Sequence, residues 1–292
     1  MFTPKDQNPW LAAVLILCAS AFIALTTMLA KGLGTGVFGP PMHPLQISHG
    51  RFTFAFLAIC GFAVAVRLPL TRIHWGLHLG RTTMGWLGVT LLFSAVTFIP
   101  MSDATAISFL NPVFCMILAI PLLGERVGPV RWLAAGIALA GAVILLRPNP
   151  ENFQFGALVA LIAAAVMGLE LILIRKLAIR EGPAQILLIN NGIGVCISSV
   201  AVLTVWQKPE PAQWAALTGI GFAMAAAQAC FVNGMARAEA SFVAPFSYAT
   251  LVFAAVLDAV VFRVWPDQVS LLGASIVLAG ALLLAIREAR PK

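Results

Sequence analysis

Residues 137–142 read Ile-Ala-Leu-Ala-Gly-Ala, and 139 positions later residues 276–281 read Ile-Val-Leu-Ala-Gly-Ala. The same shift superimposes fourteen identical residues, without a gap, when residues 102–145 are laid over residues 241–284. It also aligns three rarer residue types, pairing Pro44 with Pro183, Gln46 with Gln185 and Trp75 with Trp214. We therefore predict two copies of one structural unit, in residues 1–150 and 151–292.

The composition is that of a membrane protein. Of the 292 residues 61% are apolar and 10% are charged, and the mean hydropathy is +0.97, whereas soluble domains carry about 25% charged residues. A membrane-spanning helix needs about 20 apolar residues. Ten stretches with little or no charge approach that length: 10–30, 44–66, 82–100, 104–123, 132–146, 155–174, 183–206, 214–235, 241–262 and 269–286. The sequence thus predicts an all-α polytopic membrane protein with ten transmembrane helices.

Each copy holds five of these stretches, which is an odd number, so the second copy must enter the membrane from the opposite side. The charges of the connecting segments agree with this. The segment between the second and third stretches has three basic residues, whereas its equivalent between the seventh and eighth stretches has one. Conversely, the segment between the sixth and seventh stretches has three, and its equivalent between the first and second stretches has one. Two inverted repeats of five helices are an architecture of transporters that hold their substrate near the middle of the membrane.

Basic residues also predict which side of the membrane holds the termini. With both termini in the cytoplasm, 13 Lys and Arg residues lie in cytoplasmic segments and 4 in segments on the other side, as the positive-inside rule requires. We therefore expect a multi-pass protein of the plasma (inner) membrane, surrounded by lipid. The 13 residues are divided among six segments, so they form no single basic face for a nucleic acid.

Several segments carry a family resemblance. Phe109-Leu-Asn-Pro-Val-Phe, Leu122-Leu-Gly-Glu-Arg-Val and Gly136-Ile-Ala-Leu-Ala-Gly141 follow one another in the first copy, and Ala244-Pro-Phe-Ser-Tyr with Leu278-Ala-Gly280 stands in the second. In this order and spacing they resemble the EamA-type transporters of the drug/metabolite transporter superfamily. The resemblance covers essentially the whole chain and implies ten helices in two inverted sets of five. It also implies export of small metabolites, with exporters of aromatic amino acids the most similar type.

Ionisable side chains inside a span are costly and mark candidate functional sites. Arg51 lies seven residues after Pro44, close to His49, and its planar guanidinium suits a substrate carboxylate. Alternatively, Arg51 binds carbonyl groups at a helix end or extends to the membrane surface. Asn190 occupies the equivalent position in the second copy, so Arg51 and Asn190 are predicted to bind substrate.

Two acidic residues are candidates for coupling transport to a proton. Glu170 lies two-thirds along the sixth stretch, close to Arg175 and Lys176. Asp258 lies near the end of the ninth stretch, close to Arg263. For each of them an ion pair near the membrane surface is the simpler interpretation, since neither carboxylate is expected at the midplane.

Uncharged polar residues complete the predicted substrate site. Asn111 beside Pro112, and Tyr248 after Pro245, lie where proline frees a backbone carbonyl, which in lipid must be satisfied or line a cavity. Trp86 and Thr90 recur at helical spacing in the third stretch, and Gln228 lies in the eighth. We predict that these side chains line a cavity near the midplane. Polar packing between helices is the alternative.

Signatures of an enzyme are missing from the sequence. There is no Gly-x-x-x-x-Gly-Lys-Ser/Thr phosphate loop and no His-Glu-x-x-His motif, and His74 and His78 have no acidic residue near them in the chain. The five cysteines all lie within predicted spans. We predict no catalytic site, metal or cofactor.

The expected function is secondary transport of a small amphipathic metabolite, most simply an aromatic or neutral amino acid, by a monomer with alternating access. A membrane-embedded enzyme and a lipid-moving protein are the alternatives.

Overall fold

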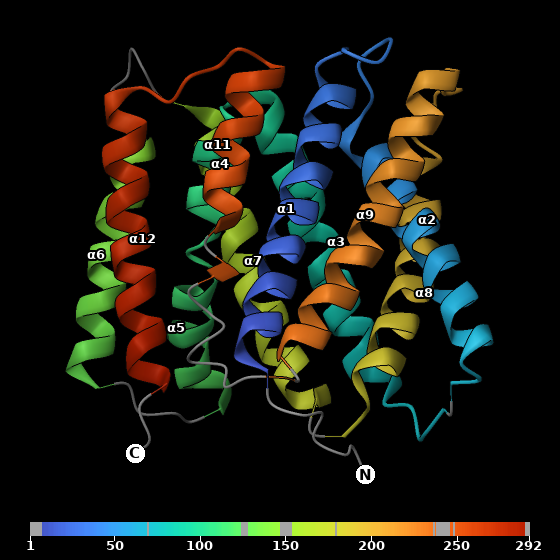
Figure 1. The fold of residues 1–292 in the computed structure, drawn as a ribbon, viewed down its shortest axis with the longest axis horizontal. Coiled ribbons are helices and arrows are strands. Elements are labelled where there is room, and N and C mark those ends of the chain that lie inside the picture. Colours follow the sequence, from blue (N-terminus) through green and yellow to red (C-terminus); the bar gives the residue numbers. More distant parts are fainter. Residues whose placement is uncertain are drawn as a thin grey trace.

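Every regular element that the structure describes is a helix. The computed structural model describes residues 8–68, 70–123, 128–146, 154–178, 180–235, 237, 246–247 and 249–289. Its helices, drawn in Figure 1, are α1 (Pro9–Gly34), α2 (Pro44–Ala65), α3 (Trp75–Phe98), α4 (Met101–Ser108), α5 (Asn111–Leu123), α6 (Pro129–Leu146), α7 (Phe155–Ala178), α8 (Pro183–Val202), α9 (Pro211–Met235), α11 (Ala249–Val261) and α12 (Gln268–Ala289). The all-α prediction is confirmed over these residues.

Among the residues that the structure describes, six helical segments are long and apolar enough to cross a membrane. They are Trp10–Gly34, Pro44–Ala65, Met101–Leu122, Phe155–Ile174, Pro183–Val202 and Pro211–Phe231. Three shorter apolar helices are Trp132–Leu145, Ala249–Val261 and Gln268–Gly280. Six of the ten predicted spans are thus confirmed by length and composition, and the other four stay predictions.

Proline begins five of the helices. α1, α2, α6, α8 and α9 start at Pro9, Pro44, Pro129, Pro183 and Pro211. Proline suits the first helical position because no N–H donor is needed there and its backbone angle is already helical. The start of α8 lies 139 residues after that of α2, and α12 likewise starts 139 residues after α6.

The fourth predicted span, 104–123, lies within the confirmed segment Met101–Leu122 but is interrupted and is not one continuous helix. α4 ends at Ser108 and α5 begins at Asn111, with a turn at Phe109 and Leu110. Pro112 has no N–H group, so it cannot donate to the carbonyl of Ser108 four residues earlier. The chain tightens instead, and Leu110 N donates to the Ile107 carbonyl at 3.0 Å.

The third helix begins earlier than the stretch 82–100 predicts. α3 starts at Trp75, so Arg81 lies within a helix and not in a connecting segment. Its side chain is buried, with 6% of the residue exposed. The apolar stretch stops at Arg81 in the sequence, but the helix continues because the bundle supplies a charged partner for this arginine.

The repeated Leu-Ala-Gly-Ala block marks the place where α6 and α12 cross. A Cβ atom on Gly141 would lie 2.6 Å from the backbone nitrogen of Val277, and one on Gly280 would lie 2.5 Å from that of Ala138. Any side chain at either glycine would force the two helices apart. Val277 and Ala138 are themselves 139 positions apart, so each copy makes the same contact to the other.

The helices stand side by side in a bundle with α6 and α12 at one edge and α2 and α8 at the other (Figure 1). Between these edges α1 packs along α9, and α3 packs along α7. In the alignment of the two copies α1 corresponds to α7, and α3 corresponds to α9. The packed pair α1 and α9 is therefore equivalent to the packed pair α7 and α3, which is compatible with an inverted repeat. We call the end of the bundle where α1 begins the termini end, and the opposite end the far end.

Candidate functional site

Three charged side chains from three helices lie close enough inside the bundle for their charges to interact. Arg51 of α2 is 4% exposed and Arg81 of α3 is 6% exposed. Arg81 Nε lies 3.6 Å from Oε1 of Glu170 on α7, and Arg51 also interacts electrostatically with Glu170. We call Arg51, Arg81 and Glu170 the central charge cluster. With two cations and one anion, its formal charge is positive.

Helix geometry explains why these side chains meet. Arg51 is the eighth residue of α2, counted from the far end, and Arg81 is the seventh of α3, counted from the termini end. At 1.5 Å per residue each lies about 10 Å inside its own end of the bundle, and the two point charges approach Glu170 from opposite ends. Gly85 makes room for the carboxylate, because a Cβ atom there would lie 2.7 Å from Glu170 Oε1.

The arginines retain hydrogen-bond donors that no described residue accepts. Within the part of the chain that the structure describes, Arg51 Nε, Arg81 Nε and Arg81 Nη1 are buried without an acceptor. The 3.6 Å between Arg81 and Glu170 is an ion-pair distance, too long for a hydrogen bond. Because most buried polar groups in proteins are paired, these free donors make the cluster a candidate binding site and not a closed ion pair.

Unpaired polar atoms continue along α3 beside the cluster. Thr82, Trp86 and Thr90 are spaced by four residues on one face of α3. Thr82 Oγ1 donates to Asn190 Oδ1 of α8 at 3.1 Å, whereas Trp86 Nε1 and Thr90 Oγ1 are buried and have no partner among the described residues. Three of the predicted substrate-binding residues, Trp86, Thr90 and Asn190, therefore lie on α3 or against it, close in sequence or space to Arg81.

The remaining uncharged candidates lie on other helices. Gln228 of α9 has a buried Oε1 with no partner among the residues described. Asn111 begins α5, and its carbonyl oxygen would lie 2.9 Å from a Cβ atom on Gly168 of α7, so it borders the helix that carries Glu170. Tyr248 lies outside the described residues. A shared cavity for these side chains stays a prediction.

The two acidic candidates have different partners from those that the sequence suggests. Glu170 lies at ion-pair distance from Arg81 of another helix. Asp258, predicted near Arg263, is buried and accepts hydrogen bonds from Lys31 Nζ at 2.6 Å and from the backbone of Met101 and Ser102 at the start of α4. Asp258 thus ties α1, α4 and α11 together, and its coupling role stays a prediction.

A second polar group joins the two halves of the chain at the termini end. Glu181, just before α8, accepts from His74 N at 2.8 Å and from Gln185 Nε2 at 2.7 Å, and its oxygens lie 2.9 Å from His74 Nδ1 and 2.8 Å from His78 Nε2. Gln185 Oε1 in turn accepts from Thr71 N at 2.7 Å. We call Thr71, His74, His78, Glu181 and Gln185 the Gln185 clamp.

The Gln185 clamp holds an ionised carboxylate. Burial by itself raises the pKa of Glu181, but hydrogen bonds from His78, His74 and Gln185 outweigh it and lower the pKa to about 2. The sequence places no acidic residue near His74 and His78, and the structure corrects this. Glu181 comes from the other half of the chain, 103 residues after His78, so sequence proximity could not reveal it.

An equivalent contact joins the halves at the far end. Gln46 Nε2 donates to the Gln207 carbonyl at 2.6 Å, and Gln46 Oε1 accepts from Gln207 N at 3.1 Å. Gln213, at the start of α9, donates to the Pro40 carbonyl at 2.7 Å. We call Pro40, Gln46, Gln207 and Gln213 the Gln46 clamp. The shift of 139 places Gln46 over Gln185 and His74 over Gln213.

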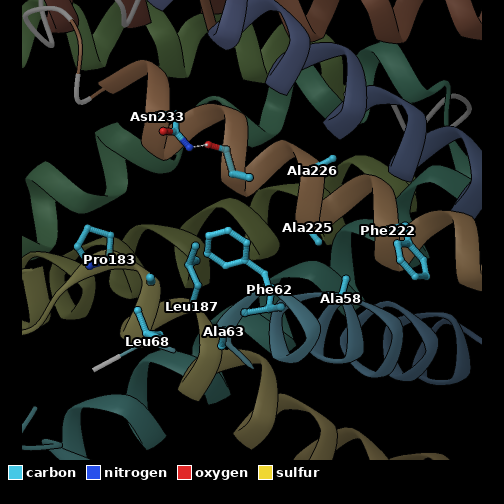
Figure 2. Close-up of a pocket in the computed structure, with 13 residues that line it drawn as sticks. Ala58, Phe62, Ala63, Leu68, Pro183, Leu187, Phe222, Ala225, Ala226 and Asn233 are labelled. Atoms are coloured by element: carbon cyan, nitrogen blue, oxygen red, sulfur yellow. Dashed lines mark hydrogen bonds between the residues drawn. The ribbon is translucent and has the colours of Figure 1, made fainter. Parts of the chain in front are cut away.

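An apolar pocket opens between α2, α8 and α9 (Figure 2). Its volume is about 520 Å³, and its walls include Phe62 of α2, Leu187 of α8 and Phe222 of α9. The polar side chain on its wall, Asn233, donates to the Ala229 carbonyl of its own helix at 2.9 Å. None of the predicted site residues that the structure describes lines this pocket, so it is a separate feature from the central charge cluster.

Arg81 is a site residue that sequence reasoning missed, although a signal for it existed. The shift of 139 pairs Trp75 with Trp214, and Trp214 begins the eighth predicted stretch. If the equivalent helix of the first copy also begins at its tryptophan, the third helix begins at Trp75, and Arg81 lies inside it.

The fold and the buried charges define a polytopic helical membrane protein with an internal polar site. The model of the EamA-like transporter family matches the chain twice, at residues 10–147 and 154–286. The chain therefore belongs to the EamA-like family, within the drug/metabolite transporter superfamily.

Named relatives extend over most of the chain. An S-adenosylmethionine uptake transporter of Rickettsia bellii is 25% identical over 267 residues, covering 91% of this chain and 92% of the relative. A riboflavin transporter of Vibrio cholerae is 25% identical over 288 residues, covering 97% and 96%, and a pseudopaline exporter of Pseudomonas aeruginosa is 24% identical over 221 residues, covering 75% and 78%. A solved crystal structure shares the fold with a TM-score of 0.64 at 20% identity, over 96% of this chain and 99% of that one.

Proposed function

We propose that this chain is a secondary transporter of small metabolites in the plasma membrane, with its substrate site at the central charge cluster. The observation that carries the proposal is the buried pair of Arg51 and Arg81 with unaccepted donors. A charged side chain inside a lipid-embedded bundle is expensive and typically marks a pathway for a substrate or ion. The relatives named for S-adenosylmethionine uptake, riboflavin transport and pseudopaline export support small metabolites as the class.

Within that class we propose aromatic or neutral amino acids as substrates. A carboxylate fits the guanidinium donors of the cluster, and Trp86, five residues after Arg81 on α3, offers an aromatic surface. Glu170 is the better candidate of the two acidic residues for coupling to a proton, because Asp258 is already held by Lys31 and two backbone donors.

An inverted repeat is the architecture that we propose for the two halves. Three observations support it. The starts of α2 and α8, and those of α6 and α12, are separated by the same 139 residues. Gly141 and Gly280 make equivalent contacts where α6 and α12 cross, and the packed pair α1 and α9 corresponds to the packed pair α7 and α3. The family model also matches each half separately.

Both termini are proposed to be cytoplasmic, so the termini end faces the cytoplasm. A reporter fused to each terminus measures this, and an external reporter would overturn it.

Alternating access is the proposed mechanism, with the two clamps as the contacts that open in turn. Each clamp joins residues of the first half to residues of the second, one at each end of the bundle. Rocking one half against the other about a site in the middle must separate the halves at one end at a time. Both clamps are formed in the structure, so each access state requires one of them to break.

Counterflow in proteoliposomes tests the proposed function. Purified monomer is reconstituted, loaded with one unlabelled solute at a time from a panel of amino acids, nucleosides, sugars and drugs, and supplied outside with the labelled form. We expect saturable accumulation of at least one metabolite that protein-free liposomes do not show, and recovery of that solute chemically unchanged. Accumulation of none of them would contradict the proposal. Recovery of a converted product would favour a membrane-embedded enzyme.

A further inference from the structure

We propose that the central charge cluster recognises one monoanionic carboxylate on the substrate, held jointly by Arg51 and Arg81, with Glu170 as the resident counter-ion. This inference rests on the proposed function and specifies the chemistry of the same site. It assigns a binding role to Arg81 and a charge-balancing role to Glu170.

The unaccepted donors point to an acceptor that arrives from outside the chain. Arg81 Nε and Nη1 belong to one guanidinium group, and both are buried without an acceptor among the described residues. Arg51 adds a third donor, its Nε. The Arg51 Cζ atom lies 3.9 Å from the centre of the Phe52 ring, so the aromatic ring supports the cation without accepting a hydrogen bond from Nε. Two guanidinium edges with free donors suit the two oxygens of a carboxylate.

Glu170 does not satisfy these donors, although it lies next to them. The gap at Gly85 lets its carboxylate sit against α3, where its nearest approach to Arg81 Nε is 3.6 Å. At this distance Glu170 offsets charge without taking the hydrogen bonds. The cluster therefore keeps its cations in the bundle while leaving their donors for a ligand.

The charge balance selects the class of anion. Two arginines and one glutamate leave one positive charge, so one carboxylate makes the occupied cluster neutral. A phosphate monoester carries about −1.5 to −2 at neutral pH and would leave the occupied cluster negative inside the membrane. Since buried uncompensated charge is costly, the cluster favours a carboxylate over a phosphate.

Matched acids and amides test the proposal in counterflow. The probes are phenylalanine with phenylalaninamide, nicotinate with nicotinamide, and phenyl phosphate, each measured in proteoliposomes of the full chain. We expect each transported acid to exceed its amide by about 10-fold or more, the effect of a charge-assisted bidentate contact, and phenyl phosphate to be excluded. Equal transport of acids and amides would overturn the carboxylate assignment while leaving the proposed transport function intact. Failure of all probes, including nicotinamide, which is uncharged, would count against both.

Variants separate a binding role from a structural one. Arg81→Gln should reduce acid counterflow about 10- to 100-fold, as loss of a charge-assisted contact does, and change amide counterflow less than about twofold. Arg51→Lys and Arg81→Lys, which keep the charge without the fork, should weaken acids selectively. Arg67→Gln, which removes an exposed cation, is the matched control and should behave as wild type. Equal loss for acids and amides in the three cluster variants would mean that the arginines only support the fold.

Glu170→Gln tests the charge-balancing role through substrate selectivity, which a purely structural role of Glu170 would not change. The substitution leaves all guanidinium donors in place and raises the formal charge of the cluster by one. We therefore expect a well-folded Glu170→Gln protein to admit phenyl phosphate and to increase the preference for acids over amides. Unchanged exclusion of phenyl phosphate, together with an unchanged acid preference, would contradict the charge-balancing role of Glu170.

Discussion

The two clamps use the same positions of the repeated unit but different chemistry. At the far end Gln46 and Gln213 bind backbone groups of the opposite half through neutral amides. At the termini end Gln185 takes the place of Gln46 and His74 takes that of Gln213, and a buried carboxylate, Glu181, is added between them. Two copies of one unit thus close both ends from two equivalent positions, with different partners.

The difference lies in the strength of closure. Hydrogen bonds to an ionised group are about twice as strong as neutral ones, and Glu181 takes part in four contacts with His74, His78 and Gln185. The far end has no such ionised acceptor among the clamp residues defined above. We therefore expect the equilibrium between access states to favour closure of the termini end in the absence of substrate.

The largest expected effect distinguishes the charged clamp from the neutral one. Glu181→Ala removes a charged acceptor from buried hydrogen-bonding groups of His78 and Gln185, and should lower the free energy of unfolding by about 3 kcal/mol, as loss of a hydrogen bond to a charged group does. Gln213→Ala, the matched change at the far end, should cost about 1 kcal/mol. Denaturant unfolding of both variants in detergent measures the two losses. Equal losses would mean that the clamps are equivalent.

A contact that really is equivalent in the two halves provides the reference for this comparison. Gly141→Ala and Gly280→Ala each place a Cβ atom within 2.6 Å of backbone in the partner helix, and both should destabilise the protein by about 2 kcal/mol through overpacking. Gly136→Ala on α6 meets no atom within 4 Å and should leave stability unchanged or raise it. Thermal unfolding of the three variants checks this, and unequal effects of the first two would break the symmetry.

The equivalent glutamines should differ by a smaller amount. Gln185 contacts both Thr71 and Glu181, whereas Gln46 contacts one residue, Gln207. Gln185→Ala should therefore cost about 2 kcal/mol and Gln46→Ala about 1 kcal/mol, at about 1 kcal/mol per net hydrogen bond. The same unfolding measurement decides the order. A larger loss for Gln46→Ala would reverse the assignment of the stronger clamp.

Acid pH should weaken the charged clamp selectively. The folded pKa of Glu181 is about 2, below its ordinary value of 4.5, so its ionisation contributes stability above pH 4.5 that is lost as the pH falls toward 2. The unfolding temperature of wild type should fall through this window by a few degrees more than that of Glu181→Gln. Gln46→Ala should keep the wild-type pH dependence. Parallel pH profiles of wild type and Glu181→Gln would contradict the pKa shift.

Sequence predicted the framework better than the contacts between charges. The shift of 139 located the starts of α8 and α12 and marked Gly141 and Gly280 as a special pair, because repeated sequence constrains both copies at once. The partners of Lys31, Glu170 and Glu181 could not be predicted from the sequence. Helices that are apolar on every face show no stripe from which their rotation can be read, and these partners come from segments more than 80 residues away in sequence.

Cross-linking each clamp during transport tests most directly the claim that the two ends open in turn. Cysteine pairs at 71 and 185, or at 46 and 207, are introduced into a protein whose five native cysteines are replaced, and counterflow of the best wild-type solute is measured before and after a reducible bifunctional thiol reagent. Single-cysteine proteins control for simple modification. We expect either cross-link alone to abolish counterflow and a reductant to restore it. Undiminished counterflow with either end locked would contradict alternating access through these clamps.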